Sequence, residues 1–150
     1  MNTKGIRISD EFDVLNISLS EILEEVIDGK SFYWTILFLD GTPNNDQKDL
    51  LKMCKKINQS ENGLIVTWEN LLTISNRFYQ MFETIILGCK NPDLLRRYNS
   101  EEEMYKTCDI TIELIDRAFW EVYSRDKLLM DRIKKKFTET TILYIPYTSG

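Results

Sequence analysis

Hydrophobic and polar residues alternate most regularly between residues 109 and 123. In the first half of this stretch, Thr111 and Glu113 fall on one face of an extended segment, and the opposite face is formed by Ile110, Ile112 and Leu114. A period of two residues predicts a strand in a sheet with one buried side. A tight turn at 116–118 and a second segment rich in aromatic and β-branched residues complete a predicted hairpin.

Apolar residues at helical spacing predict helices on both sides of this hairpin. Ser18 is a good N-cap with Glu21 as its capping-box partner, and Gly29 is placed to end the first helix. A second helix over 46–57 turns four apolar residues inward, namely Leu50, Leu51, Cys54 and Ile57.

Three further helices are indicated by their caps and apolar stripes. Thr67 caps one that ends near Asn76, and Ser100 starts a small acidic one. The helix over 125–137 carries three lysines near its C-terminal end, where the helix dipole favours cations. Its inward residues are Leu128, Leu129, Ile133 and Phe137 or their near neighbours.

Extended segments supply the remaining elements. The apolar run over 31–40 indicates a central strand that is buried on both faces. Short strands are predicted at 64–66 and 140–145, and one or two edge strands within 6–17. Residues 78–87 fit either a strand or a continuation of the preceding helix, and a strand is favoured.

Chain length and composition fit a single folded domain. With 150 residues, 43% of them hydrophobic, the chain is long enough to bury most of its apolar surface. The pattern predicts one α+β domain over 1–150, with packed helices and a mixed or mainly antiparallel sheet of about five or six strands. No apolar run approaches the roughly 18 residues of a membrane span, and Met1–Arg7 lacks the apolar core of a secretory signal. Three cysteines without a Cys-x-x-Cys pair are expected to be buried free thiols in a reducing cytoplasm.

The net charge of −5 is unevenly distributed along the chain. Acidic residues dominate 9–28 and 99–121, and basic residues dominate 48–56 and 125–136. The negative balance argues against a nucleic-acid partner, whose phosphates would be repelled over most of the surface, and is compatible with a basic protein partner. The acidic stretches have two interpretations, a solvated surface or an electrostatic docking face.

No residue pattern identifies a catalytic, metal or cofactor site. The chain has no histidine, which removes the usual general base and the commonest zinc ligand, and its six glycines are isolated rather than clustered in a phosphate-binding loop. Asp109 and Glu113 fit one strand face, but Ile115 stands where a nuclease of the Asp…Glu-x-Lys type has its lysine. We therefore expect a protein that is not an enzyme and needs no cofactor. The alternatives are a carboxylate- or metal-dependent hydrolase, or a non-catalytic subunit of a larger assembly.

A resemblance to a known family rests on the size of the chain, its acidic α+β character and two of its segments. The segments are Gly63–Leu72 (GLIVTWENLL) and Asp109–Ser124 (DITIELIDRAFWEVYS). In these respects the chain resembles the small cytoplasmic immunity proteins of bacterial polymorphic or contact-dependent inhibition toxin systems. The resemblance implies stoichiometric binding to a toxin domain, often a basic nuclease, whose substrate site is blocked. It carries over no catalytic residue and no binding residue.

The partner-binding residues are therefore proposed from charge and aromatic character alone. Trp68, beside a predicted helix start, is a core or rim residue and the candidate aromatic contact of the interface. Two acidic clusters are expected to pair with lysine and arginine side chains of the toxin domain: Glu24, Glu25 and Asp28, and Asp109, Glu113 and Asp116. The expected function is neutralisation of the toxin by steric and electrostatic occlusion of its active site.

Overall fold

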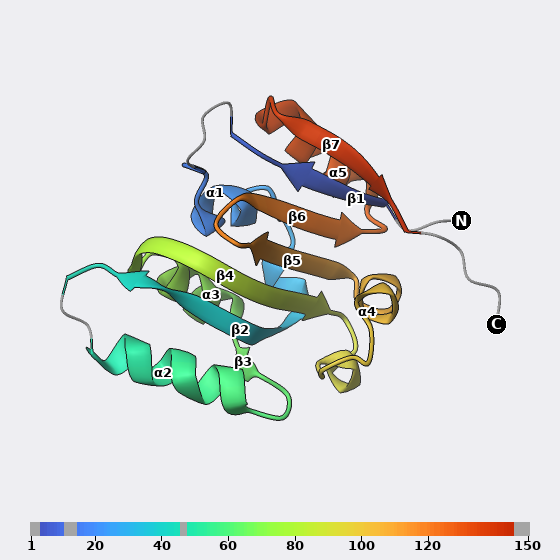
Figure 1. Ribbon diagram of the computed structural model, residues 1–150. Helices are drawn as coiled ribbons and strands as arrows, with labels where there is room; N and C mark the ends of the chain where they lie inside the picture. Colours follow the sequence, from blue (N-terminus) through green and yellow to red (C-terminus); the bar gives the residue numbers. More distant parts are fainter. Residues whose placement is uncertain (1–3, 11–14, 46–47, 146–150) are drawn as a thin grey trace.

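The structure, a computed structural model, describes residues 4–10, 15–45 and 48–145 (Figure 1). Within these residues, seven strands form one antiparallel sheet in the order β3-β2-β4-β5-β6-β1-β7. The strands are β1 (Lys4–Ile8), β2 (Tyr33–Pro43), β3 (Leu64–Val66), β4 (Phe78–Cys89), β5 (Ile110–Ile115), β6 (Phe119–Ser124) and β7 (Thr140–Tyr144). The predicted α+β class and the antiparallel sheet are confirmed, with seven strands rather than five or six.

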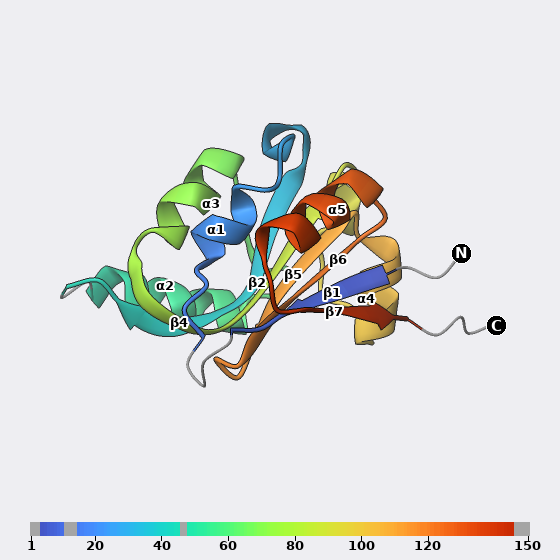
Figure 2. The same ribbon diagram turned by 90° about the horizontal axis from the view of Figure 1, so that it is seen from above.

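The helices cover the two faces of this sheet unequally. Figure 2 shows α1, α3 and α5 on one face and α4 on the other, while α2 lies beside the sheet near β2. Their bounds are α1 (Leu19–Leu23), α2 (Lys48–Gln59), α3 (Trp68–Ser75), α4 (Glu101–Thr107) and α5 (Lys127–Lys136). Two short 3₁₀-helices, η1 (Gly29–Ser31) and η2 (Pro92–Leu94), lie in connecting segments.

The face under α1, α3 and α5, called the covered face, carries the larger apolar core. Alternate strand residues point into it, among them Trp34, Ile112 and Trp120, each at most 1% exposed. The Trp120 indole N–H donates to the carbonyl of Ile17 at 2.8 Å, which satisfies the polar group of this buried ring. The predicted apolar face of the hairpin is confirmed.

A smaller core lies under α4 on the opposite face. Met104 and Tyr105 of α4 are buried there with Leu87 of β4 and Tyr123 of β6. The rings of Tyr105 and Tyr123 stack with their centroids 3.7 Å apart. The expectation of a sheet with only one buried side is therefore wrong at the hairpin, because α4 also covers the polar side of β5, where Thr111 is fully buried.

Local sequence signals place the helix starts. The hydroxyls of Ser18, Thr67 and Ser100 accept backbone N–H groups in the first turns of α1, α3 and α4, as predicted. Gly29 does not end α1 but opens η1. A Cβ atom at Gly29 would lie 2.3 Å from the ring of Trp68, so glycine is required here by close packing and not by a helix end.

Three expectations about position are wrong. Leu51 and Leu128, expected to face inward, are 51% and 69% exposed, because the buried stripes of these helices pass through the neighbouring Leu50 and Leu129, which were also expected to face inward. The N-terminal strand β1, expected at an edge, lies between β6 and β7. The first strand of the sheet is thus held by the last elements of the chain.

The other strand predictions are confirmed, including the ambiguous one. The segments predicted at 31–40, 64–66, 78–87 and 140–145 correspond to β2, β3, β4 and β7. β2 is buried on both faces in its first half, although it lies second from the edge of the sheet and not at its centre. The helix start predicted at residue 46 and part of the predicted edge strands lie outside the described residues.

The predicted turn joins β5 to β6. Asp116 and Arg117 both have positive φ, 49° and 58°, and the N–H of Ala118 donates to the carbonyl of Ile115 at 2.9 Å. Positive φ at both central residues is the type I′ geometry that suits hairpins, and aspartate tolerates it better than most residues. The turn exposes Asp116 and Arg117 at one end of the sheet.

Candidate functional site

The first predicted acidic cluster lies at the end of α1 and is largely neutralised within the chain. The Lys136 ammonium contacts a carboxylate oxygen of Glu24 at 2.9 Å and one of Glu25 at 3.4 Å. Asp28 is exposed beside η1, where its carbonyl accepts the N–H and the hydroxyl of Ser31. Two of these three carboxylates already have a cation, so an incoming basic side chain would gain less from them.

Trp68 and Asp109 are also engaged within the fold. The Trp68 ring lies 5.3 Å from the Trp34 ring, at the rim of the covered-face core. Asp109 accepts the backbone N–H of Lys90 at 2.9 Å and faces the Arg125 guanidinium at 3.3 Å. These contacts hold α3 against the sheet and the start of β5 against the end of β4.

The second predicted cluster is not one surface. Asp109 precedes β5 and Asp116 follows it, so they lie at opposite ends of the strand. Glu113, between them, is only 4% exposed. Of the predicted partner-binding carboxylates in this stretch, Asp116 is therefore the one that the structure exposes to solvent.

Beyond α4, none of the described helices lies in front of β4, β5, β6 and β1 on the second face of the sheet, as Figure 1 shows. The cross-strand register places Phe38, Ile85 and Glu113 opposite one another on this face, and Glu113 opposite Glu121. We call this surface the open face. Its floor is formed by Glu113 and Glu121, and its half-exposed side chains are Arg7, Phe38, Glu83, Ile85, Ile115 and Phe119.

Three carboxylates, called the acidic group, gather at the turn end of the open face. Asp40 and Glu83 are opposite each other on β2 and β4, and Asp116 shares a hydrogen bond with Glu83. That hydrogen bond, with slight desolvation and the repulsion of Asp116 and Asp40, raises the pKa of Glu83. The nearby Arg117 guanidinium lies 4.7 Å above the ring of Phe82. The acidic group therefore holds mutually repelling charges at the surface.

Two carboxylates are buried side by side beneath the open face. Glu121 is compensated, because Arg7 and the Tyr123 hydroxyl each donate to it at 2.7 Å. For Glu113, burial raises the pKa to about 7; a hydrogen bond from Tyr105 lowers it, and repulsion from neighbouring glutamates raises it further. Within the described part of the chain, Glu113 Oε1 has no hydrogen-bond partner. This carboxyl titrates near neutral pH.

Arg7 connects this buried pair to the surface. Its guanidinium lies 4.0 Å above the Phe119 ring while it binds Glu121, and its side chain is 41% exposed. Stacking on an aromatic ring and pairing with a carboxylate both restrict the guanidinium plane. The open face thus combines a fixed cation, half-exposed apolar side chains and, at its turn end, the acidic group.

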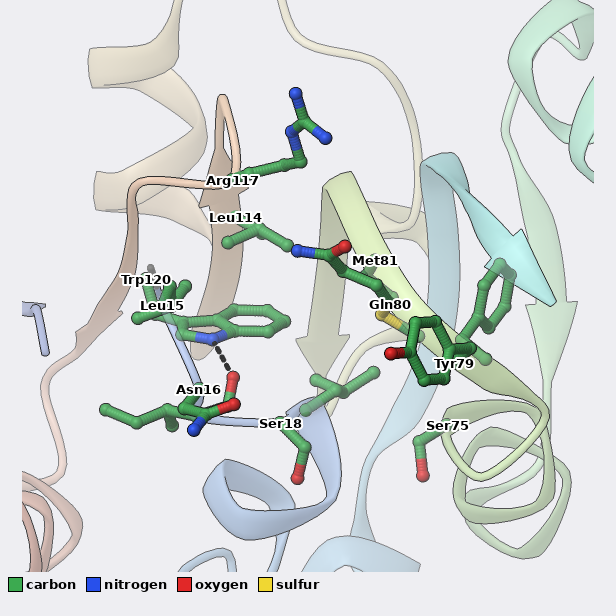
Figure 3. Close-up of a pocket in the computed structure, with 13 residues that line it drawn as sticks. Leu15, Asn16, Ser18, Ser75, Tyr79, Gln80, Met81, Leu114, Arg117 and Trp120 are labelled. Atoms are coloured by element: carbon green, nitrogen blue, oxygen red, sulfur yellow. Dashed lines mark hydrogen bonds between the residues drawn. The ribbon is translucent and has the colours of Figure 1, made fainter. Parts of the chain in front are cut away.

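A hollow of about 290 Å³ opens on the opposite side of the sheet, beside α1 and α3. Figure 3 shows its floor, which includes Leu114 and the Trp120 ring, and its rim, where Tyr79 and Gln80 extend from β4. Tyr79 is 79% exposed. Among the described residues, neither a partner-binding residue predicted from the sequence nor a member of the acidic group lines this hollow, although Arg117, which lies near the acidic group, does.

Sequence reasoning missed Asp40 and Glu83 as site residues. Asp40 ends the apolar run of β2, and Glu83 lies in the segment whose type was ambiguous. Alternation along 78–87 would have placed Glu83 and Ile85 on one face once a strand was assumed. The pairing of that face with Asp40 depends on strand register, which bulges in β2 shift.

Comparison with known proteins identifies no relative, because no family model, no curated protein and no solved structure matches the chain. Within the described ranges, no three side chains of His, Cys, Asp or Glu are grouped to hold a metal ion. None of the helices described is both long and apolar enough to cross a membrane. Cys54, Cys89 and Cys108 are free and buried, as predicted.

Proposed function

We propose that this chain is a protein-binding module that neutralises a basic toxin domain, of the nuclease class, by covering its active site with the open face. The observation that carries the proposal is the acidic group, Asp40, Glu83 and Asp116, beside half-exposed apolar side chains. Apolar side chains with an acidic group at one end are suited to a partner that offers apolar contact beside a basic patch. The resemblance to immunity proteins supports the same class of partner.

The acidic group favours a cationic partner for an energetic reason. The hydrogen bond that Glu83 shares with Asp116 is the main cause of its raised pKa, and repulsion from Asp116 and Asp40 raises this pKa further. A lysine or arginine side chain placed among them relieves the repulsion and forms charge-assisted hydrogen bonds. Glu24, Glu25 and Asp109 have less to gain, because Lys136 and Arg125 already pair with them.

Occlusion follows from the chemistry of the proposed partner. A nuclease domain holds nucleic-acid phosphates with lysine and arginine side chains, and these are the groups that the acidic group would engage. Phe38, Ile85 and Phe119 supply apolar contact beside it, which slows dissociation. The chain would then compete with the nucleic-acid substrate for one surface of the toxin.

The test uses the tagged chain as bait in its native host, compared with the variant Asp40→Lys/Glu83→Lys/Asp116→Lys. The wild-type chain is expected to retain a basic protein in stoichiometric amount through a salt wash. Once separated, that protein should degrade plasmid DNA or total RNA, and added wild-type chain should stop the degradation. The triple variant should fail at both steps, since it replaces attraction with repulsion.

The matched control, Glu24→Lys/Glu25→Lys/Asp28→Lys, changes the net charge by the same amount on the other acidic cluster. It is expected to retain the partner and to inhibit it. Circular dichroism and urea unfolding confirm that each variant is folded. The proposal is wrong if the retained protein is not inhibited, if no protein is retained, or if reversal of the acidic group leaves inhibition unchanged.

A further inference from the structure

β7 forms one edge of the sheet, and within the described residues only β1 pairs with it. The Ser9 N–H donates to the carbonyl of Glu139 at 2.9 Å, continuing the β1–β7 ladder by one pair. Antiparallel ladders alternate, so positions 139, 141 and 143 bond to β1. The backbone N–H and C=O groups of Thr140 and Ile142 therefore point away from the sheet.

β7 lacks the features that keep sheet edges from pairing with other strands. Its sequence, TTILY, contains no charged residue, no proline and no glycine. Its register with β1 runs from Thr140 to Tyr144 without a shift, so no bulge twists the edge away. A neutral, regular and β-branched edge of this kind is a ready template for another strand.

The opposite edge of the sheet is protected by contrast. β3 is three residues long, and beyond it two side chains take the place of a neighbouring strand on β2. The Asn58 amide accepts the N–H of Leu39 at 2.9 Å and donates to its carbonyl at 3.0 Å. The Arg97 guanidinium donates to the carbonyl of Leu37 at 2.7 Å. Within the described residues, no side chain takes such a role at Thr140 or Ile142 of β7.

We propose that β7 is a self-association surface, on which a second copy of this chain pairs antiparallel, with Ile142 opposite Ile142 of the second copy. A twofold axis through this point brings the outward backbone groups of both strands together and closes the assembly at a dimer. The edge brings no charge to the contact, although each chain carries a net charge of −5. The two sheets become one continuous sheet.

A second copy suits this edge better than a basic partner does. A basic segment would bind more tightly where carboxylates are close to it. The acidic group is far from β7 in the sheet, because β1 and β6 lie between β7 and the hairpin strand β5. β7 offers only neutral backbone and side-chain groups, which match those of an identical strand. Self-association through β7 leaves the open face uncovered, so this inference stands apart from the proposed function.

Sedimentation equilibrium of the purified chain tests the proposal. We expect the mean mass to rise from the monomer value of 17.8 kDa towards twice that value. The rise should occur between about 1 µM and about 1 mM, the range in which small interfaces associate. A mass that stays at the monomer value over this whole range would overturn the proposal.

Ile142→Pro is the sharpest variant, because it removes an N–H that points outward and leaves the bonds to β1 in place. It is expected to stay monomeric while folded, whereas the control Ile142→Val keeps the N–H and should dimerise like the wild type. Thr141→Lys is a second variant, with a charge on an exposed edge position and no backbone change. If folded Ile142→Pro or Thr141→Lys dimerises as the wild type does, β7 is not the interface.

Discussion

The two faces of one sheet show how differently the same strands are used. The covered face buries aromatic and aliphatic side chains under three helices, and the indole N–H groups of its buried Trp34 and Trp120 both donate to backbone carbonyls. The open face buries two carboxylates, and one oxygen of Glu113 has no hydrogen-bond partner among the residues that the structure describes. At its turn end, Glu83 lies beside Asp116 and Asp40, whose charges repel its own. Stability is concentrated on the first face, and the second face carries groups that stability alone does not explain.

Truncation of Trp120 is the strongest way to test this contrast. Trp120→Ala removes a fully buried ring from the covered face and leaves the carbonyl of Ile17 without its donor. We expect a loss of about 3–5 kcal/mol of unfolding free energy, measured by urea titration. The adjacent Phe119→Ala, on the open face and half-exposed, should cost about 1–2 kcal/mol. Equal losses would contradict the assignment of stability to the covered face.

Glu113→Gln tests the contrast between the two faces through the pH dependence of stability. The folded-state pKa of about 7 lies above the ordinary value of 4.5, so the folded state binds the proton more tightly. Wild-type stability should therefore fall as pH rises from 4.5 to 7, and Glu113→Gln should remove this fall. At pH 8 the variant is expected to be more stable by up to about 3 kcal/mol, and near pH 4 the gain should vanish.

Thermal unfolding across pH 4–8 measures this effect for Glu113→Gln, with Glu121→Gln as the matched control. Glu121 already has Arg7 and Tyr123 as donors, so its amide variant should bring no comparable gain at high pH. A wild-type stability that is flat between pH 4.5 and 7 would show that Glu113 is not held in an unfavourable ionised state.

Arg7→Gln is expected to change the free energy of unfolding less than Trp120→Ala or Glu113→Gln does. It leaves the carboxylate of Glu121, whose side chain is 6% exposed, without its cation. Because Arg7 itself is 41% exposed, water screens part of the interaction, and we expect a loss of about 1–2 kcal/mol in urea unfolding. Arg117→Gln, in the exposed turn, should change stability by less than about 0.5 kcal/mol. Similar losses for the two variants would contradict the role given to Arg7.

Much of the fold could be predicted from local patterns in the sequence. Ser18, Thr67 and Ser100 predicted helix starts because capping involves residues only two or three positions apart. The hairpin followed from alternation and a turn, both local. Burial of Glu113 could not be predicted, because it depends on α4 folding back over β5. Gly29 was misinterpreted for the same reason, since its contact with Trp68 joins distant segments.

The candidate site was harder to predict than the fold. Asp116 was found from its place in the hairpin turn, but its neighbours Asp40 and Glu83 come from β2 and β4. Their proximity depends on the order of the strands and on register shifts along β2, which a single sequence does not specify. Charge counted along the chain therefore located one member of the acidic group and missed the other two.

The position of β1 has a consequence for how the molecule is made. Its two neighbours, β6 and β7, are the last two strands in the described residues, and Arg7 is 114 residues away from the Glu121 that it binds. During synthesis on the ribosome, β1 emerges before the other described strands, and its two partners are available only after the hairpin and then β7 have been translated. Closing so long a loop is slow, and both sides of β1 stay unpaired until then. Among the described strands, β1 is therefore translated first, and it can take its place in the sheet only after β7, the last of them, has been translated.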